Sequence, residues 1–208
     1  MANKFTTSVN IIRDSERDLN YIPTPNSIRV VNQISNDFKK GVRSFNIIGS
    51  YGTGKSSFLW AFQQSILNKK KYFGINLIPN PSIDFVNIVG EFKSLRENIA
   101  EVFDVKISKT NSDNIFTEIF NLYHDIGKKN KLLFLVIDEF GKFLEYASQN
   151  DPERELYFIQ QLAEFVNNPD LNIVLFTTVH QNFDAYATAV LIAFHAPKSG
   201  LYLEFMNE

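Results

Sequence analysis

The sequence predicts a three-layer α/β fold, in which a mainly parallel central sheet is flanked by helices. The first observation behind this prediction is a pair of apolar runs of strand length, Leu132–Ile137 and Asn172–Thr177. Strands that are buried on both faces have such continuous apolar stretches, as in the centre of a parallel sheet. The second observation is that strand-like runs and amphipathic helical segments alternate along the chain, which is typical of a doubly wound α/β domain.

The first half of the chain is predicted to contain two helices and two strands. Residues 1–26 are polar and end in a proline-containing stretch, so we expect an extended N-terminal segment. Ser27 is expected to cap a helix at Ile28–Lys40, where apolar residues recur at three- and four-residue steps. Next come a strand at 44–48, a helix that begins near Lys55, a loop at 76–82 and a strand at 83–89.

The second half of the chain continues the same alternation. Helices are expected at 94–103, from 112 to 126 and at 153–166, each with apolar residues along one face. The C-terminal tail, 190–208, offers two candidate strands, Val190–Phe194 and Leu201–Phe205. The link to the first of them is short for a parallel crossover, and the second would lie at an edge of the sheet.

Length and composition indicate one α/β domain. The chain has 208 residues, of which 44% are hydrophobic and 21% charged, as is ordinary for a globular protein. We divide it into an N-terminal extended segment at 1–26, a core at 27–189 and an atypical C-terminal tail at 190–208.

The same composition excludes several classes of function. A net charge of −2 shows no global attraction to nucleic acid or anionic lipid. The sequence has no cysteine, which rules out disulfides, thiol catalysis and zinc–cysteine sites. No apolar run approaches the roughly 20 residues of a membrane span. The first residues also lack a signal-peptide core, so we expect a cytoplasmic location and no membrane partner.

The most specific motif is Gly49–Ser56, which matches the phosphate-binding pattern G-x-x-x-x-G-K-[ST] between a predicted strand and a predicted helix. Backbone N–H groups of such a loop form a concave anion site, and the glycines leave no Cβ in the way of the phosphates. Lys55 is expected to reach the β- and γ-phosphates, and the Ser56 hydroxyl to ligate Mg²⁺. A glycine-rich turn with a solvated lysine is the alternative, which the flanking elements disfavour. The expected cofactor-binding residues are Gly49, Ser50, Tyr51, Gly52, Thr53, Gly54, Lys55, Ser56 and Ser57.

The second motif is the apolar strand Leu132–Ile137 with Asp138 and Glu139 directly after it. In open α/β sheets, ligands bind at the carboxyl ends of the strands, so both carboxylates should lie beside the phosphate loop. Asp138 is expected to hold Mg²⁺ through its water shell, which makes Ser56 and Asp138 the predicted metal ligands. Glu139 is expected to orient or deprotonate the attacking water. A solvated strand end is the alternative, but the position about 80 residues after a phosphate loop favours a Walker B element.

With these motifs in order, the chain resembles the additional-strand, AAA+/STAND-like class of P-loop ATPases over residues 28–189. The stretches 136–147 and 177–187 look like those of large bacterial ATPases of mobile-element and phage-defence type. The resemblance implies that ATP is bound and hydrolysed with Mg²⁺, and that hydrolysis drives a conformational change. It also implies partners, namely a homo-oligomer or larger multi-protein complex and DNA.

In that class, a polar side chain at the end of the strand after Walker B contacts the γ-phosphate or the attacking water. Thr178 is the first choice by strand parity and proximity, and Gln181 is the second. The resemblance therefore implies Glu139, Lys55 and Thr178 as the catalytic residues. His180 is open to two interpretations, as a general base or, preferably, as a loop histidine hydrogen-bonded to its neighbours. The polar residues at this strand end are Thr177, Thr178, His180 and Gln181.

The chain also departs from the class. AAA+ ATPases continue into a helical lid with a second sensor arginine, for which the sequence after the core is too short. We hypothesise that this is the ATPase core of a longer ancestral protein, cut or altered near residue 190. Arg154 is a candidate for a trans-acting arginine, but its charged neighbours favour a solvated helix start. A GTPase is disfavoured because the sequence has no N-K-x-D string. A small-molecule kinase is disfavoured because no arginine-rich lid follows. An ABC-type ATPase is disfavoured because no signature motif lies between the two Walker motifs. The alternative from a different class is a nucleotide-binding interaction or switch module with little or no hydrolysis of its own.

Overall fold

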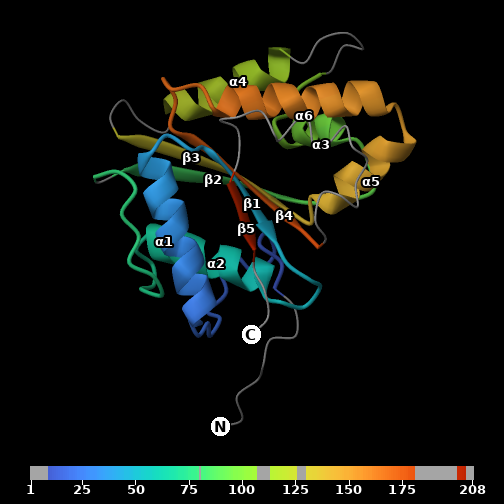
Figure 1. Ribbon diagram of the computed structural model, residues 1–208. Coiled ribbons are helices and arrows are strands. Elements are labelled where there is room, and N and C mark those ends of the chain that lie inside the picture. Colours follow the sequence, from blue (N-terminus) through green and yellow to red (C-terminus); the bar gives the residue numbers. More distant parts are fainter. Residues whose placement is uncertain (1–8, 80, 107–112, 126–129, 181–200, 205–208) are drawn as a thin grey trace.

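The computed structural model describes residues 9–79, 81–106, 113–125, 130–180 and 201–204. The helices are α1 (Pro25–Lys39), α2 (Lys55–Ile66), α3 (Leu95–Val102), α4 (Asp113–Asp125), α5 (Gly141–Gln149) and α6 (Pro152–Val166). The strands are β1 (Ser44–Ile48), β2 (Ser82–Val89), β3 (Lys131–Asp138), β4 (Ile173–Val179) and β5 (Leu201–Glu204). Helices α1 and α2 cover one face of the sheet, and α3, α4 and α6 cover the other (Figure 1).

The sheet has the strand order β2-β3-β4-β1-β5, and every neighbouring pair in it is parallel. This confirms the predicted three-layer α/β fold with a mainly parallel central sheet. Strand β4 lies between β1 and β3, although it follows both in sequence. The carboxyl ends of these three strands therefore lie side by side at one edge of the sheet, where ligands bind in open α/β sheets.

Two apolar cores, one on each face of the sheet, hold the layers together. Strand β3 contributes to both, because its successive side chains point to opposite faces. Leu132, Phe134 and Val136 join the core under α1 and α2, and Leu133, Leu135 and Ile137 join the core under α3 to α6. Burial on both faces explains why the sequence of this strand is apolar throughout.

Helix α1 begins earlier than the sequence pattern predicts, at Pro25 rather than Ile28, and its cap is Thr24 rather than Ser27. Thr24 Oγ1 accepts a hydrogen bond from the Ser27 N–H at 3.1 Å, and Ser27 Oγ accepts one from the Thr24 N–H at 2.9 Å. This reciprocal pair is a capping box. Proline is tolerated at the first helical position because an N–H there would have no partner within the helix.

Helix α5 has no counterpart among the predicted elements. It has nine residues, and its Phe143 and Leu144 pack into the core under α3 to α6. A helix this short is marginal by itself and obtains its stability from tertiary packing. For that reason the local sequence pattern does not reveal it.

The N-terminal segment packs against α2 and contains a turn at 11–16, where the sequence predicts extended chain. Ile11 is 1% exposed and belongs to the core under α1 and α2. The indole N–H of Trp60 donates to the carbonyl oxygen of Asp14 at 3.0 Å. These contacts join residues far apart in sequence, so the polar composition of the segment did not indicate them.

Strand β5 lies at one edge of the sheet and is parallel to β1, with Ile47 paired to Leu203. It covers most of the range in which the sequence predicts an edge strand. The other candidate strand of the tail, Val190–Phe194, lies outside the described residues, as does Gln181.

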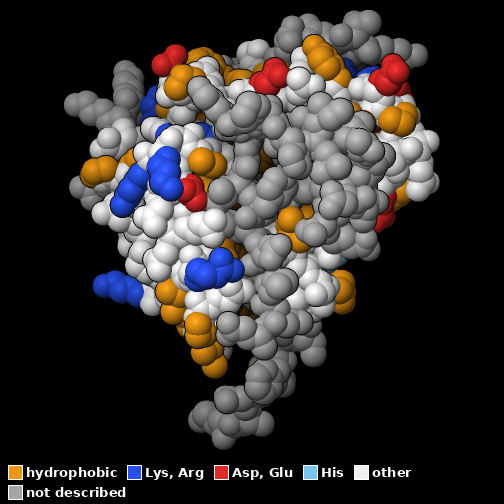
Figure 2. Space-filling model, in the orientation of Figure 1, with side chains coloured by type: hydrophobic (Ala, Val, Ile, Leu, Met, Phe, Trp, Pro, Cys, Tyr) orange, Lys and Arg blue, Asp and Glu red, His pale blue; other side chains and the backbone are white. Residues whose placement is uncertain are grey.

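The described surface carries both signs of charge. On the face drawn in Figure 2, basic side chains lie mainly on the side of α1, and most of the acidic ones lie toward α4 and α6. Among the helices of the described ranges, none is both long and apolar enough to cross a membrane.

Candidate functional site

The phosphate loop leaves the sheet at the end of β1, beside the end of β4. The Gly49 N–H donates to the Val179 carbonyl oxygen at 3.2 Å, which continues the β1–β4 pairing into the start of the loop. Gly52 and Gly54 have φ angles of 82° and 85°, in the left-handed region that favours glycine. Helix α2 begins directly afterwards at Lys55, so its unpaired N-terminal N–H groups face the loop. The structure thus contains the predicted order of strand, loop and helix.

Lys55 is buried within its own loop, with 5% of its surface exposed. Its ammonium group donates to the carbonyl oxygens of Gly49 at 2.5 Å and Ser50 at 2.8 Å, and it lies 3.2 Å from Nδ1 of His180. Burial lowers the pKa of Lys55, while the charges of Asp138 and Glu139 act in the opposite direction. The buried lysine of the predicted phosphate loop therefore lies within electrostatic range of the two carboxylates of the predicted Walker B element.

Asp138, Glu139 and Phe140 form a sharp turn at the end of β3, the predicted Walker B strand, and we call this turn the Walker B elbow. Glu139 has a φ of 56°, a left-handed conformation that is costly for a residue with a Cβ. The Thr178 hydroxyl donates to Asp138 Oδ1 at 2.6 Å and accepts the Glu139 N–H at 2.9 Å. The Phe140 N–H donates to the Thr178 carbonyl oxygen at 2.8 Å. Thr178 therefore holds all three residues of the elbow in place.

The Glu139 side chain forms an ion pair with Lys142, three residues later in the first turn of α5. The hydrogen bond with Glu139 raises the pKa of Lys142 above its ordinary value. The Glu139 side chain is 28% exposed and that of Lys142 is 48% exposed, so the pair lies at the surface of the site. The three-residue spacing is visible in the sequence, but Glu139 precedes α5 and has a left-handed backbone, so the fold and not helical periodicity brings the two side chains together.

His180 contacts the phosphate loop from the end of β4. An ammonium group is only a donor, so Nδ1 of His180 accepts from Lys55 and the ring is neutral with its proton on Nε2. Burial, followed by the positive charge of Lys55, lowers the pKa of His180. The ring centroid lies 5.4 Å from that of Tyr51 in the loop. The histidine is hydrogen-bonded to a neighbour, as the preferred interpretation expects, but that neighbour is the phosphate-loop lysine.

Comparison with known proteins adds information on the fold. No protein-family model matches the sequence, and no curated protein does either. The Drosophila ORC bound to DNA matches with a TM-score of 0.57 and 11% sequence identity, over 95% of this chain and 46% of that one. The ADP form of the Aeropyrum pernix ORC2 protein matches with a TM-score of 0.53 and 16% identity, over 90% of this chain and 51% of that one. The ADPNP–ADP complexes of the same protein match with a TM-score of 0.51 and 18% identity, over 90% and 50%.

The chain shares the three-layer α/β fold, with its mainly parallel central sheet, of the matched parts of these ORC chains. At these identities the likeness establishes the fold alone, and the chain spans about half the length of the ORC chains that it matches. The narrower resemblance to mobile-element and phage-defence ATPases stays a prediction.

Most of the predicted site residues lie at the carboxyl edge of the sheet. Ser56 and Ser57 lie in the first turn of α2, where both are partly buried. Thr178 is fully buried, and its hydroxyl is occupied by the Walker B elbow. Arg154 lies elsewhere, exposed in the first turn of α6. Sequence reasoning missed the contacts of His180 and Lys142, because both depend on how separate elements pack.

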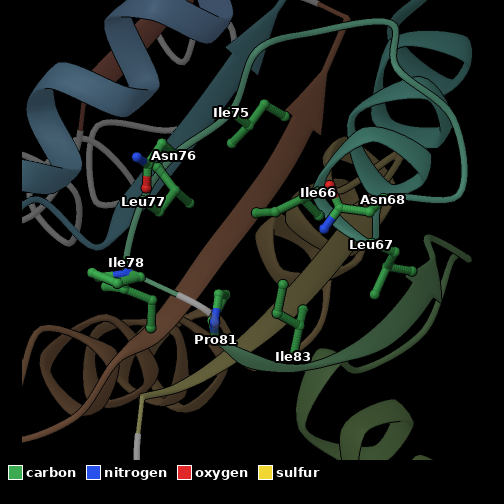
Figure 3. Close-up of a pocket in the computed structure, with 10 residues that line it drawn as sticks. Ile66, Leu67, Asn68, Ile75, Asn76, Leu77, Ile78, Pro81 and Ile83 are labelled. Atoms are coloured by element: carbon green, nitrogen blue, oxygen red, sulfur yellow. The ribbon is translucent and has the colours of Figure 1, made fainter.

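A cavity of about 750 Å³ lies away from this site (Figure 3). It is lined by the end of α2, the loop that precedes β2, and Ile83 at the start of β2. Because all the strands are parallel, the start of β2 is at the edge opposite the phosphate loop. The cavity is therefore separate from the candidate phosphate site.

The residues present fit a nucleoside triphosphate with a magnesium ion. The loop has glycines at its left-handed positions, and its buried lysine has main-chain oxygens and a histidine as partners that phosphate oxygens can replace. Ser56 and Asp138 supply the hydroxyl and carboxylate oxygens that Mg²⁺ prefers. Asp138 is 3% exposed and is fixed by the Thr178 hydroxyl, so it is already oriented at the strand end.

Proposed function

We propose that this chain binds ATP with Mg²⁺ at the loop Gly49–Ser56 and hydrolyses the bond between the β- and γ-phosphates. The observation that carries the proposal is that β4 joins the two motifs: His180 at its end lies 3.2 Å from the buried Lys55 ammonium, and the Thr178 hydroxyl donates to Asp138 at 2.6 Å. A phosphate-loop cation next to a pair of strand-end carboxylates is the arrangement that phosphoryl transfer requires, because such catalysis depends on positioning and charge stabilisation.

Each residue has a role that its position supports. Lys55 exchanges its main-chain and histidine partners for β- and γ-phosphate oxygens. Ser56 and Asp138 would hold Mg²⁺, which would neutralise charge on the phosphate oxygens. Glu139 orients the attacking water and accepts its proton. Thr178 fixes the elbow, while its predicted direct contact with the γ-phosphate stays a prediction.

The structural neighbours support two parts of the proposal, namely that the nucleotide is ATP and that the chain acts within a larger complex. The Aeropyrum pernix ORC2 structures are an ADP form and ADPNP–ADP complexes, and the Drosophila ORC structure is bound to DNA. By analogy, we propose that hydrolysis drives a conformational change within an oligomer or a DNA-associated complex. In this chain, the loss of the Lys55–His180 contact on nucleotide binding would release the end of β4, which offers a route for that change.

The second candidate is a nucleotide-binding switch module with little or no hydrolysis. The Glu139–Lys142 ion pair favours it, because the Lys142 ammonium occupies a carboxylate oxygen that would otherwise be free to contact the attacking water. The two candidates share a binding site and differ in whether phosphate is released.

The proposal is tested by measuring ATP binding and phosphate release on the same preparations. Lys55→Ala should lose binding and turnover together, since it removes the buried cation of the loop. Glu139→Gln should keep ATP binding and lose turnover. Lys39→Ala and Glu118→Gln, which change exposed residues on α1 and α4, are the matched controls and should behave as wild type.

The results of these two measurements decide between the ATPase and the switch module. Binding without phosphate release above background, with or without DNA and at several protein concentrations, would select the switch module. Failure of the wild type to bind ATP would remove both candidates. GTP should be included as a competitor, because the phosphate loop does not read the base.

A further inference from the structure

The end of β2 is in direct contact with the Walker B elbow. Strand β2 pairs with β3 up to Val89, which is opposite Asp138. The next residue, Gly90, donates its N–H to the Asp138 carbonyl oxygen at 2.7 Å. The two strands thus stay hydrogen-bonded up to the residue before Glu139.

Gly90 lies against the elbow so closely that no side chain fits there. A Cβ at Gly90 would be 2.1 Å from the carbonyl oxygen of Glu139 and 2.7 Å from its carbonyl carbon. It would also be 3.2 Å from the carbonyl oxygen of Asp138. Because the first two atoms belong to the backbone, a side-chain rotation cannot relieve the overlap. The elbow itself would have to move.

We infer that Gly90 is a positioning residue for Glu139, because the end of β2 confines the elbow on the side opposite Thr178. Glu139 has a left-handed backbone that must be held by its surroundings. Thr178 holds it from β4 through the hydroxyl, and Gly90 confines it from β2 through close contact. The inference rests on the proposed role of Glu139 as the group that activates water.

The residues after Gly90 connect this contact to the surface. The ring of Phe92 is 54% exposed and lies 5.4 Å from the ring of Tyr146 on α5. The charge of Glu91 contributes to the raised pKa of Lys142, the ion-pair partner of Glu139. A displacement of the segment 90–93 would therefore reach the backbone of Glu139 at Gly90, and it would reach α5 through the Phe92–Tyr146 contact.

The test is Gly90→Ala, with Gly74→Ala as the matched control. Apart from its neighbours in the chain, a Cβ at Gly74 would meet no atom within 4 Å, and the φ of Gly74 is not left-handed, so alanine fits there. We expect Gly90→Ala to lower kcat about 10- to 100-fold, since small misplacements of catalytic groups have effects of this size. The KM for ATP should stay within about twofold, because the phosphate loop is untouched. Gly74→Ala should leave both values unchanged.

Residue-resolved amide hydrogen exchange gives a readout that does not depend on turnover. The amides of Glu139 and Phe140 are protected by their hydrogen bonds to Thr178, and Gly90→Ala should accelerate their exchange while amides in α1 keep their rates. If the wild type has no ATPase activity, the proposed function fails, yet this measurement still decides whether Gly90 holds the elbow. Wild-type exchange at both amides, or a wild-type kcat, in Gly90→Ala overturns the inference.

A second variant covers the case in which Gly90→Ala does not fold. Glu139→Gly gives the elbow the backbone freedom to move its carbonyl away from a new Cβ. The combined Gly90→Ala and Glu139→Gly variant should then fold, and in a double-mutant cycle the two changes should be non-additive in Tm. A combined variant that is as unstable as the sum of the two changes contradicts the inference.

Discussion

Thr178 provides the sharpest test of how the site is held together. Replacing Thr178 by valine keeps the shape of the side chain and removes the hydroxyl that binds the Walker B elbow. The lost bond to the Asp138 carboxylate is charge-assisted and contributes about 1.5–3 kcal/mol, and the lost bond from the Glu139 N–H about 0.5–1.5 kcal/mol. The Glu139 N–H retains Asp138 Oδ1 at 3.1 Å as an acceptor, which limits the cost.

We therefore expect Thr178→Val to lower the free energy of unfolding by about 2–4 kcal/mol. Urea denaturation measures this change as a shift of the midpoint at constant slope. Because Glu139 loses its main support, kcat should also fall about 10- to 100-fold while ATP binding persists. Thr178→Ser keeps the hydroxyl and should retain most of the activity, at a cost of about 1 kcal/mol for the missing methyl group.

Substitution of the neighbouring Thr177 is a matched control, because it should lower stability without displacing the Walker B elbow. Its hydroxyl donates to Asn46 Oδ1 at 2.9 Å and does not contact the elbow. Thr177→Val should thus destabilise the protein by about 1–3 kcal/mol, since it leaves a buried acceptor unpaired, but it should keep kcat. The reasoning is refuted if Thr178→Val unfolds at the wild-type midpoint, or if Thr177→Val lowers kcat as much as Thr178→Val does.

Two further predictions concern charged groups of the site. Lys142→Met removes the ion-pair partner of Glu139 and should raise kcat. The loss of stability should stay below about 1 kcal/mol, because the pair is partly exposed. An unchanged or lower kcat in steady-state assays would contradict this prediction. The pKa of His180 lies below its ordinary 6.5; the charged groups that face the ring are Lys55, Lys142, Asp138 and Glu139. Below that pH the native state therefore binds fewer protons than the unfolded state. The stability of the protein should fall as the pH drops through 6.5. His180→Gln should reduce this fall in denaturation curves recorded between about pH 7.5 and 5.5, and an identical pH profile would count against it.

The sequence determined the features that are local or strongly periodic. Gly49–Ser56 predicts a phosphate loop because its strand, glycines and helix start are contiguous in the sequence, and the structure shows that order. The run Leu132–Ile137 reveals a central strand because burial on both faces leaves no polar positions. The alternation of such elements was enough to predict a mainly parallel sheet.

The tertiary structure decided what joins these elements into a site. Placing β4 between β1 and β3 brings Thr178 to the elbow and His180 to Lys55, across separations of 40 and 125 residues. Pairing β2 with β3 brings Gly90 against Glu139, where a single Cβ would not fit. Such contacts depend on strand order and register, which non-local packing sets and which leave little trace in the local pattern of apolar and polar residues. The sequence therefore predicted which groups do chemistry, and the fold decided which other groups hold them in position.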